Sequence, residues 1–381
     1  MDNLLVEIDM AASSPAMTRK KSAYNHPREN QMSVRPWPEN GLEYLDKCPV
    51  CGDAGRTLLH DGLHDRLFGA PGLWTMYRCN HCRVGYLDPR PTLETVGLAY
   101  TNYVTHDPQR PAPTQAIKLA RLKIRNGYLN RKFGYHESPA WSLGYWIMRM
   151  MPFPIRGEWD HRARHLPIPK TGANHLLDVG CGNGDFLRDA RSAGWDVQGT
   201  DLDPVAVGIA RRSGIQIWQG RYDTAPLEPD SFDVITTHQV IEHVPDPLAF
   251  IRTLSGWLKP GGLLWIGTPN LDCPIHEKYG EFYGNLHPPQ HMVVFNQKSL
   301  VNLVHSAGLH KQKFLKRGLH DYNQTLGSAA LARGLTGEVV YKGVRNAPLR
   351  DRLLGLINEL RAWADPTACS DFVLICEKPR Q

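Results

Sequence analysis

Two pairs of cysteines near the start of the chain have a spacing that suits metal binding. Cys48 and Cys51 form one Cys-x-x-Cys pair, and Cys79 and Cys82 form a second pair further along the chain. Four thiolates on two such turns suit a tetrahedral zinc ion, and a site with four protein ligands is closed and therefore structural. We predict a structural zinc ion at these cysteines, the alternatives being unmetallated surface thiols or His81 in place of one ligand.

A glycine-rich turn later in the chain could hold a nucleoside. Gly180, Gly182 and Gly184 follow a hydrophobic run at 176–179 and precede a helix that we expect to begin near Asp185. Glycine permits the tight turn and lets a ligand lie against bare backbone, with the N–H groups of the helix start facing it. A dinucleotide fingerprint would place its third glycine at Asp185, and no Lys-Ser or Lys-Thr follows to make a phosphate-binding loop.

Asp201 completes this predicted nucleoside site. It ends the next predicted strand, about 20 residues beyond the glycines, where a carboxylate can accept hydrogen bonds from both hydroxyl groups of a ribose. The glycine turn and Asp201 together therefore predict a site for a nucleoside that lacks a pyrophosphate.

The elements that must position these residues alternate between buried strands and capped helices. Asp203 and Asp246 each place an N-cap acid before a proline, and Gly214 and Gly261 stand where helices are expected to end. Repeated strand–helix–strand units predict an α/β fold with a parallel, doubly wound sheet. The predicted strands are 175–179, 196–200, 232–237 and 263–268.

Further motifs follow the glycine turn in order. They are 230–235, 240–247, 258–262, 268–270, 288–295 and a last strand at 372–378. Together with the turn and Asp201 they resemble class I S-adenosylmethionine-dependent methyltransferases, which implies a Rossmann-like methyltransferase sheet. The run at 77–91 resembles the zinc ribbon found on many bacterial methyltransferases of glycan and natural-product pathways. An ordinary glycine turn in another α/β protein is the alternative.

The resemblance implies a role for each matching residue in binding S-adenosylmethionine. Around the methionine part it places Asp178, Gly180, Gly182 and Gly184, on the ribose Asp201, and beside the adenine Leu202. The family often has an Asp near the adenine amino group, but Arg221 stands there, so Tyr222 or backbone is expected to replace that contact. His238 is expected to face the cofactor or the acceptor, the alternative being a helix-start residue that satisfies backbone groups.

The resemblance also implies the chemistry of the acceptor side. Methyl transfer is an in-line displacement, and a hydroxyl acceptor must also lose a proton, for which histidine is the natural base at neutral pH. His291 matches a family histidine that acts near the acceptor in sugar C-methylating relatives. We therefore hypothesise that His291 or His287 is the base and keep His238 as a further candidate, the alternative for His291 being a role in bracing the fold.

A catalytic divalent cation is not expected. Some ubiquinone-forming relatives have a Glu-x-x-Glu-His metal cluster after the fourth strand, whereas the matching residues here are Gln239, Glu242 and His243. The first carboxylate is missing, so we expect structural roles for Glu242 and His243.

Length and composition bound the remaining possibilities. The chain has 381 residues, of which 41% are hydrophobic, and a net charge of +6 that is too weak by itself to indicate nucleic acid. No apolar run approaches the roughly 18 residues of a membrane-spanning helix, and the N-terminus does not resemble a secretory signal, so a cytoplasmic protein is expected. The predicted division is a mobile leader at 1–45, a zinc ribbon at 46–91, a helical connector at 92–169 and the class I methyltransferase domain at 170–381.

The predicted function is methyl transfer from S-adenosylmethionine to a small-molecule or sugar acceptor, on oxygen or carbon, in a biosynthetic pathway. One alternative is an RNA methyltransferase, which the zinc ribbon and the positive charge favour. The absence of an Asn/Asp-Pro-Pro-aromatic signature after the fourth strand makes nucleic acid the less favoured acceptor. The other alternative is a non-catalytic zinc-bearing interaction protein, and the oligomeric state stays open.

Overall fold

The computed structural model describes residues 34–101 and 115–380, which belong to one unit of the chain. Most of the predicted leader and part of the predicted connector lie outside the described residues. The predicted division of the chain therefore stays a prediction.

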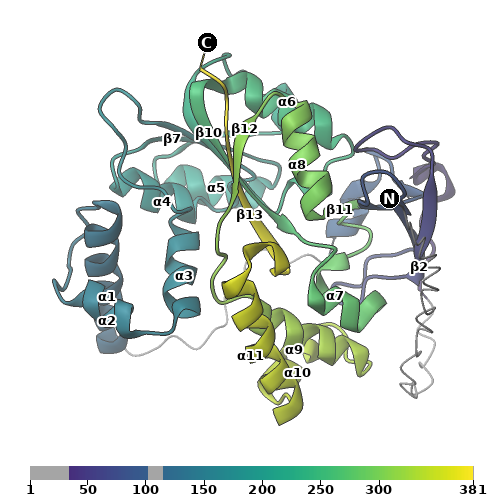
Figure 1. The fold of residues 1–381 in the computed structure, drawn as a ribbon. Coiled ribbons are helices and arrows are strands. Elements are labelled where there is room, and N and C mark those ends of the chain that lie inside the picture. The colour runs from purple at the N-terminus through teal and green to yellow at the C-terminus, as the bar shows by residue number, and fades with distance from the viewer. Residues whose placement is uncertain (1–33, 102–114, 381) are drawn as a thin grey trace, which may run out of the picture. The chain divides into compact units, whose positions relative to one another are not determined.

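A seven-stranded sheet forms the centre of this unit (Figure 1). Its strands, in chain order, are β6 (His175–Val179), β7 (Asp196–Asp201), β8 (Gln216–Gln219), β9 (Phe232–His238), β10 (Leu258–Pro269), β12 (His310–Phe314) and β13 (Asp371–Glu377). Their order in the sheet is β12-β13-β10-β9-β6-β7-β8, and β13 runs antiparallel to both of its neighbours. The strands from β10 to β8 are parallel, so the predicted doubly wound α/β sheet is confirmed.

Helices cover both faces of the sheet, as the alternating side chains of its strands require. Leu176 and Val234 pack on one face against α1 to α5, whereas Leu177 and Ile235 pack on the other face against α6 and α8. These helices are α1 (Gln115–Phe133), α2 (Gly144–Met150), α3 (Phe153–Arg162), α4 (Asp185–Ser192), α5 (Pro204–Arg212), α6 (Pro247–Trp257) and α8 (Gln297–Ser306).

The predicted helix starts are confirmed, but one predicted helix end is wrong. The Asp203 carboxylate accepts from the Val205 N–H and the Asp246 carboxylate from the Ala249 N–H, which caps α5 and α6. Helix α6 ends at Trp257, and Gly261 lies inside β10 with a φ of 79°. The pairing of β10 with β9 shifts register there, so this glycine forms an irregularity in the strand rather than a helix end.

The N-terminal part of the described chain forms its own small sheets. A two-stranded sheet pairs β1 (Leu42–Glu43) with β5 (Arg90–Pro91). A second sheet has four strands. The members of that four-stranded sheet are β2 (Arg56–Leu63), β3 (Trp74–Cys79), β4 (Gly85–Leu87) and β11 (Val293–Val294). Strand β11 comes from the predicted methyltransferase domain, so the cysteine-bearing module and that domain share one sheet.

Three further helices lie between β12 and β13 in the chain. They are α9 (Asp321–Ala332), α10 (Glu338–Arg345) and α11 (Leu349–Ala364), and both α10 and α11 pack against α9 (Figure 1). The short helix α7 (Pro274–Tyr279) also contacts α9. The segment between α11 and β13 brings Asp371 to the carboxyl end of β9 and β10.

Candidate active site

The glycine turn has the backbone conformation that its sequence predicts. Gly180, Gly182 and Gly184 all have positive φ values, of 76°, 53° and 77°. A Cβ added to Gly180 would lie 2.2 Å from Cγ2 of Val240, so no side chain fits at that position. Gly184 is the N-cap of α4 and leaves the first turn of that helix without a side-chain cap. The turn is therefore bare backbone at a helix start, as a bound ligand requires.

Asp201 links this turn to the ends of the neighbouring strands. Its Oδ2 accepts from the Gly182 N–H at 2.7 Å, and its Oδ1 accepts from the Asp203 N–H at 2.9 Å. Each carboxylate oxygen can accept a second hydrogen bond, so these contacts leave room for hydroxyl donors. Leu202, which is exposed, follows Asp201, and Tyr222 follows β8, whose end is tied to the Asp201 carbonyl through the Gly220 N–H.

Asp178 lies buried below the turn, at the boundary between β6 and β9. The Thr236 hydroxyl donates to its Oδ1 at 2.6 Å. Burial raises the pKa of Asp178 to about 6, although Arg164 lowers it. Because Thr236 and His238 lie two residues apart on β9, Asp178 and His238 belong to the same face of the sheet.

Arg164 is a residue that the sequence analysis missed. Its guanidinium is buried and lies over the Trp265 ring at 4.4 Å and over the Phe186 ring at 4.9 Å. Its Nε has no hydrogen-bond partner, and no ion pair to it occurs within the described ranges 34–101 and 115–380. Burial lowers its pKa to about 10. A buried cation without a carboxylate partner is costly, so this position suits an anionic ligand.

A strained backbone presents this side chain to the site. Arg164 and His165 follow α3 with φ values of 50° and 56°, a left-handed conformation that is uncommon outside glycine. The His165 Nε2 lies 3.1 Å from the Lys316 carbonyl, which holds the turn in place. No spacing in the sequence marks Arg164, since its neighbours come from distant segments.

His238 faces a buried carboxylate at the carboxyl end of β9. Its Nε2 lies 3.9 Å from Oδ2 of Asp371, and Nε2 of His320 lies 3.8 Å from the same oxygen. Both nitrogens are buried and lack a hydrogen-bond partner. Gln239 donates to the other Asp371 oxygen at 2.7 Å, and Arg317 Nε lies 3.4 Å from Oδ2. Three segments far apart in sequence thus converge on one carboxylate.

The electrostatics of this group favour a neutral imidazole. Burial lowers the pKa of His238 well below its usual value, and Arg164, Arg317 and His320 lower it further. The rings of His161, His238 and Trp265 form a triangle, with the His161 ring 4.9 Å from the His238 ring and the Trp265 ring 5.4 and 5.8 Å from these two. Burial raises the pKa of Asp371 to about 6. At pH 7 a neutral His238 beside an ionised Asp371 can accept a proton.

His287 and His291 gather in a second cluster, apart from His238. The His291 ring lies 5.0 Å from the His287 ring and 4.7 Å from the His243 ring, and its Nδ1 lies 2.8 Å from the Asn285 carbonyl. Burial lowers the pKa of His291 well below its usual value. The structure therefore brings His238 to the side of Asp178 and places His287 and His291 with η4 (Ile241–His243).

This second cluster contains a group of three possible metal ligands that the sequence motif at 240–247 did not reveal by itself. Ligand atoms of Glu242, His243 and His291 lie within 4.8 Å of one another, a spacing that could hold a metal ion. Oε1 of Glu242 is buried and lacks a partner, while Oε2 accepts from the Thr268 hydroxyl at 3.0 Å. Burial raises the pKa of Glu242 to about 8, so a protonated carboxyl also fits this position. The expected absence of a catalytic cation stays a prediction.

Residues 155–313 match the model of a family described as a methyltransferase domain. A ubiquinone biosynthesis O-methyltransferase from Paraburkholderia phymatum is 30% identical over 209 residues, which are 51% of this chain and 76% of that protein. The chain belongs to the family of class I S-adenosylmethionine-dependent methyltransferases. The resemblance drawn from its motifs is thereby confirmed.

Other relatives match shorter parts of the methyltransferase. A ubiquinone biosynthesis O-methyltransferase from Xanthomonas campestris is 41% identical over 124 residues, so this chain spans 50% of the length of that relative. The crystal structure of a SAM-dependent methyltransferase from Archaeoglobus fulgidus is 18% identical, with a TM-score of 0.36 over 54% of this chain and 87% of that one. None of the helices within 34–101 or 115–380 combines the length and the hydropathy that crossing a bilayer needs.

The four cysteines of the methyltransferase form a compact cluster. The sulfurs of Cys48 and Cys82 are 3.7 Å apart, and those of Cys51 and Cys79 are 3.6 Å apart. A zinc ion bound to four sulfurs at about 2.3 Å in a tetrahedron would separate them by about 3.8 Å. The arrangement therefore fits a structural zinc ion and leaves no open position for a substrate.

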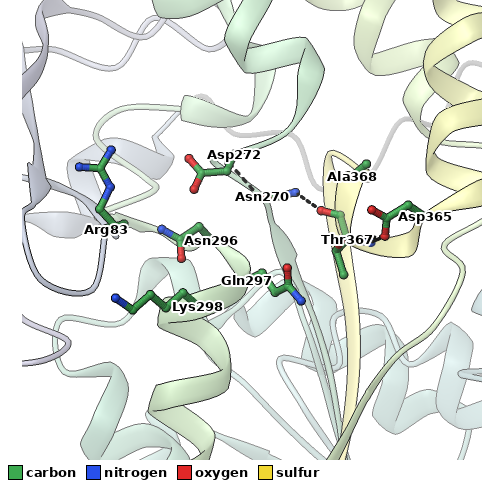
Figure 2. Close-up of a pocket in the computed structure, with 9 residues that line it drawn as sticks. All are labelled: Arg83, Asn270, Asp272, Asn296, Gln297, Lys298, Asp365, Thr367 and Ala368. Carbon is green, nitrogen blue, oxygen red and sulfur yellow. Dashed lines mark hydrogen bonds between the residues drawn. The ribbon is translucent and has the colours of Figure 1, made fainter. Parts of the chain in front are cut away.

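One cavity of the structure lies away from the predicted site residues. It has a volume of about 440 Å³ and is bounded by Arg83, by Asn270 after β10, by Lys298 at the start of α8 and by the Asp365 turn (Figure 2). Figure 2 shows Asn270 donating to the Thr367 carbonyl, at 3.0 Å, on one wall of this cavity. Neither the glycine turn nor His238 lines it.

Proposed function

We propose that the methyltransferase transfers a methyl group from S-adenosylmethionine to an oxygen or carbon atom of a small-molecule or sugar acceptor in a biosynthetic pathway. The observation that supports this most is the neutral, half-buried His238 beside Asp371 on the same sheet face as Asp178. A small organic acceptor with a removable proton needs such a base, whereas transfer to a more nucleophilic atom does not. The ubiquinone-forming relatives, named as O-methyltransferases, agree with this acceptor class.

The cofactor half of the site uses residues of the turn and of α3. Asp201 accepts the ribose hydroxyls, Leu202 and Tyr222 border the adenine, and Asp178, Gly180, Gly182 and Gly184 surround the methionine part. We assign the methionine carboxylate to Arg164, because its buried guanidinium forms no ion pair in the described structure and its Nε lacks a hydrogen-bond partner. When bound, S-adenosylmethionine supplies an electrophilic methyl group on a sulfonium.

The acceptor half uses His238 as the base. The ring nitrogen of His238 that does not face Asp371 takes the acceptor proton, the lone pair left on the acceptor attacks the methyl carbon, and the electron pair of the broken C–S bond stays on sulfur. The Asp371 carboxylate stabilises the imidazolium that forms, and Gln239 and Arg317 hold that carboxylate in place. His287 and His291, the other candidate bases, lie in the second cluster.

A radiochemical assay tests this function. Purified methyltransferase is incubated with methyl-labelled S-adenosylmethionine and extracts of its own cells, which are then separated into RNA, protein, glycan-lipid and small-molecule fractions. We expect label in the small-molecule or glycan fraction with wild-type protein and little with His238→Gln, while His287→Gln serves as the matched comparison. Label confined to RNA or protein would contradict the proposal, and so would full turnover by His238→Gln.

A further inference from the structure

Helix α11 carries a continuous apolar stripe on its exposed side. Five of its large side chains recur at intervals of four, three, four and three residues, and a sixth widens the stripe. All six are between 42% and 71% exposed, and the six are Leu349, Leu353, Leu356, Ile357, Leu360 and Trp363. Because residues three and four apart lie above one another on a helix, the stripe runs along the whole length of α11.

The opposite side of α11 is fixed to the fold. Gly355, Asn358, Glu359 and Ala362 are buried, and helix α11 packs against α9 and α3. The Asn358 amide donates to the Thr325 hydroxyl of α9 at 3.0 Å. The stripe faces outward because the opposite side of α11 packs against α9 and α3. Six exposed apolar side chains on one helix face mark an interaction surface.

Basic residues border the stripe on both sides. With 3.6 residues per turn, Arg350 and Arg361 lie along one edge and Arg352 along the other, and all three are exposed. The two acids of α11 do not balance them on this face. Asp351 forms an ion pair with Arg333, and Glu359 is buried, where its Oε2 accepts the backbone N–H groups of two residues at the start of α9.

Charge decides which partner suits this surface. In a dimer formed through the stripe, the arginines of the two copies would lie close together without opposing acids. The positive charges would then repel one another. An anionic lipid surface neutralises them, while the leucines enter the boundary between headgroups and acyl chains. Trp363 near the end of the stripe, with the Lys316 ammonium 4.9 Å from its ring centre, matches the aromatic and basic residues that favour that boundary.

We propose that the methyltransferase docks on anionic membrane surfaces through the α11 stripe, lying on the bilayer without crossing it. The contact is reversible, because one amphipathic helix with three bordering arginines gives moderate affinity. Docking would also orient the acceptor side, since Glu359 on the buried side of α11 holds the backbone of His320, whose ring borders Asp371. The proposal goes beyond the proposed function and does not depend on it.

Vesicle co-sedimentation with the full chain tests the docking. One set of vesicles contains phosphatidylcholine alone and the other contains phosphatidylcholine with phosphatidylglycerol. We expect binding to the anionic vesicles that weakens with added salt, and little binding to the zwitterionic ones. The double variant Leu356→Glu/Leu360→Glu is expected to lose vesicle binding, whereas the control Leu73→Glu, at a leucine that is 65% exposed in the N-terminal module, is expected to keep it.

Two arginine variants and a measurement of the oligomeric state by sedimentation complete the test. Arg350→Gln and Arg361→Gln are each expected to lower partitioning onto anionic vesicles roughly fivefold. Both sites are exposed, and unchanged thermal melts would show that the variants fold. The proposal is overturned if wild-type protein ignores anionic vesicles or if the leucine variant still binds them. It is also overturned if sedimentation shows a wild-type dimer that the leucine variant converts to monomer, because a second copy then covers the stripe.

Discussion

Arg164 is buried among aromatic rings, and its guanidinium forms no ion pair in the part of the chain that the structure describes, although the Asp178 carboxylate interacts with it electrostatically. If it binds the methionine carboxylate, replacing it by glutamine removes a charge-assisted hydrogen bond. We expect Arg164→Gln to weaken binding of S-adenosylhomocysteine roughly 10- to 100-fold in calorimetry. Binding of 5′-methylthioadenosine, which lacks the carboxylate, should not change.

The control for Arg164 lies two residues away. Arg162 is exposed and forms an ion pair with Glu158, so Arg162→Gln should leave both affinities unchanged. Equal loss of both ligands in Arg164→Gln would show a structural role for this residue instead.

Asp371 gives the site a characteristic pH dependence. Its pKa is raised to about 6, so below that pH the carboxyl is protonated and cannot stabilise a charged His238. We expect kcat/KM to be level above pH 6 and to fall as the pH drops below it. In Asp371→Asn, kcat should be lower by roughly 10²- to 10⁴-fold, and the fall near pH 6 should vanish. The other charged or titratable groups that interact with this pair include His161, Arg164, Glu242, Tyr283, Arg317, His320, Asp321 and Cys369.

Glu377 provides the comparison for Asp371. It lies at the other end of β13, where it pairs with Lys311, so Glu377→Gln should keep the wild-type pH profile. A wild-type profile in Asp371→Asn would remove this carboxylate from the mechanism.

Glu242 couples stability to pH. Burial raises its pKa from 4.5 to about 8, so between these values the folded chain holds a proton that the unfolded chain has lost. Stability therefore falls as pH rises through this window, by up to about 1.4 kcal/mol per pH unit. Glu242→Gln should abolish that slope and melt higher than wild type at pH 8, unlike the exposed control Glu228→Gln. Destabilisation at pH 8, or activity lost on chelation at this cluster, would instead indicate a metal ligand.

The sequence was informative about residues whose role depends on local backbone. Gly180 and Gly184 require positive φ, and such turns are visible as a spacing of glycines. Arg164, His320 and Asp371 were not predicted, because packing of distant segments brings them to the site and no local pattern marks them. His291 was identified from a motif, but its neighbours Glu242 and His243 emerged as a cluster with it only in three dimensions.

At the scale of elements, the pairing of β4 with β11 connects the cysteine cluster to the second cluster around His291. Cys79 and Cys82 flank the turn between β3 and β4, and β11 lies two residues after His291. Loss of the metal should therefore disturb both regions. We expect about one zinc ion per chain in wild type and none in Cys51→Ser, with a lower melting temperature and reduced methyl transfer.

The scattered thiol Cys376 supplies the comparison for that variant. It is buried in β13 far from the cluster in sequence, and Cys376→Ser should keep the zinc. Wild-type protein without zinc, or Cys51→Ser with full metal content, would contradict a four-cysteine site.

Elements with local signals were predicted well. Strands β9, β10 and β13 show as hydrophobic runs, and Asp203 and Asp246 mark helix starts through their caps. The short β8 and the mostly polar β12 were not predicted. The prediction of a helix end at Gly261 was wrong because glycine occurs both at helix ends and at irregularities in strands. Only the pairing of β10 with β9 distinguishes these two roles. The pairing of β4 with β11 was not predicted, since two residues are too short for a recognisable pattern.

At the scale of the whole molecule, the N-terminal module and the methyltransferase fold share one hydrophobic core. Val84 and Tyr86 pack in the same cluster as Met292 and Phe295. Removing residues 1–91 would expose that surface and leave β11 without a partner. We expect the truncated chain to melt at a lower temperature by circular dichroism, or to fail to fold. An unchanged melting temperature would show that the module is independent.

Strand β13 has a consequence for how the protein is made. It occupies the gap between β10 and β12, yet it is translated after both of them. Until residues 371–377 leave the ribosome, a nascent chain has two open strand edges that can pair with other nascent chains. It also lacks the carboxylate beside His238. Translation of this one strand therefore both closes the sheet and completes the acid–base pair, so that incomplete chains are aggregation-prone and inactive together.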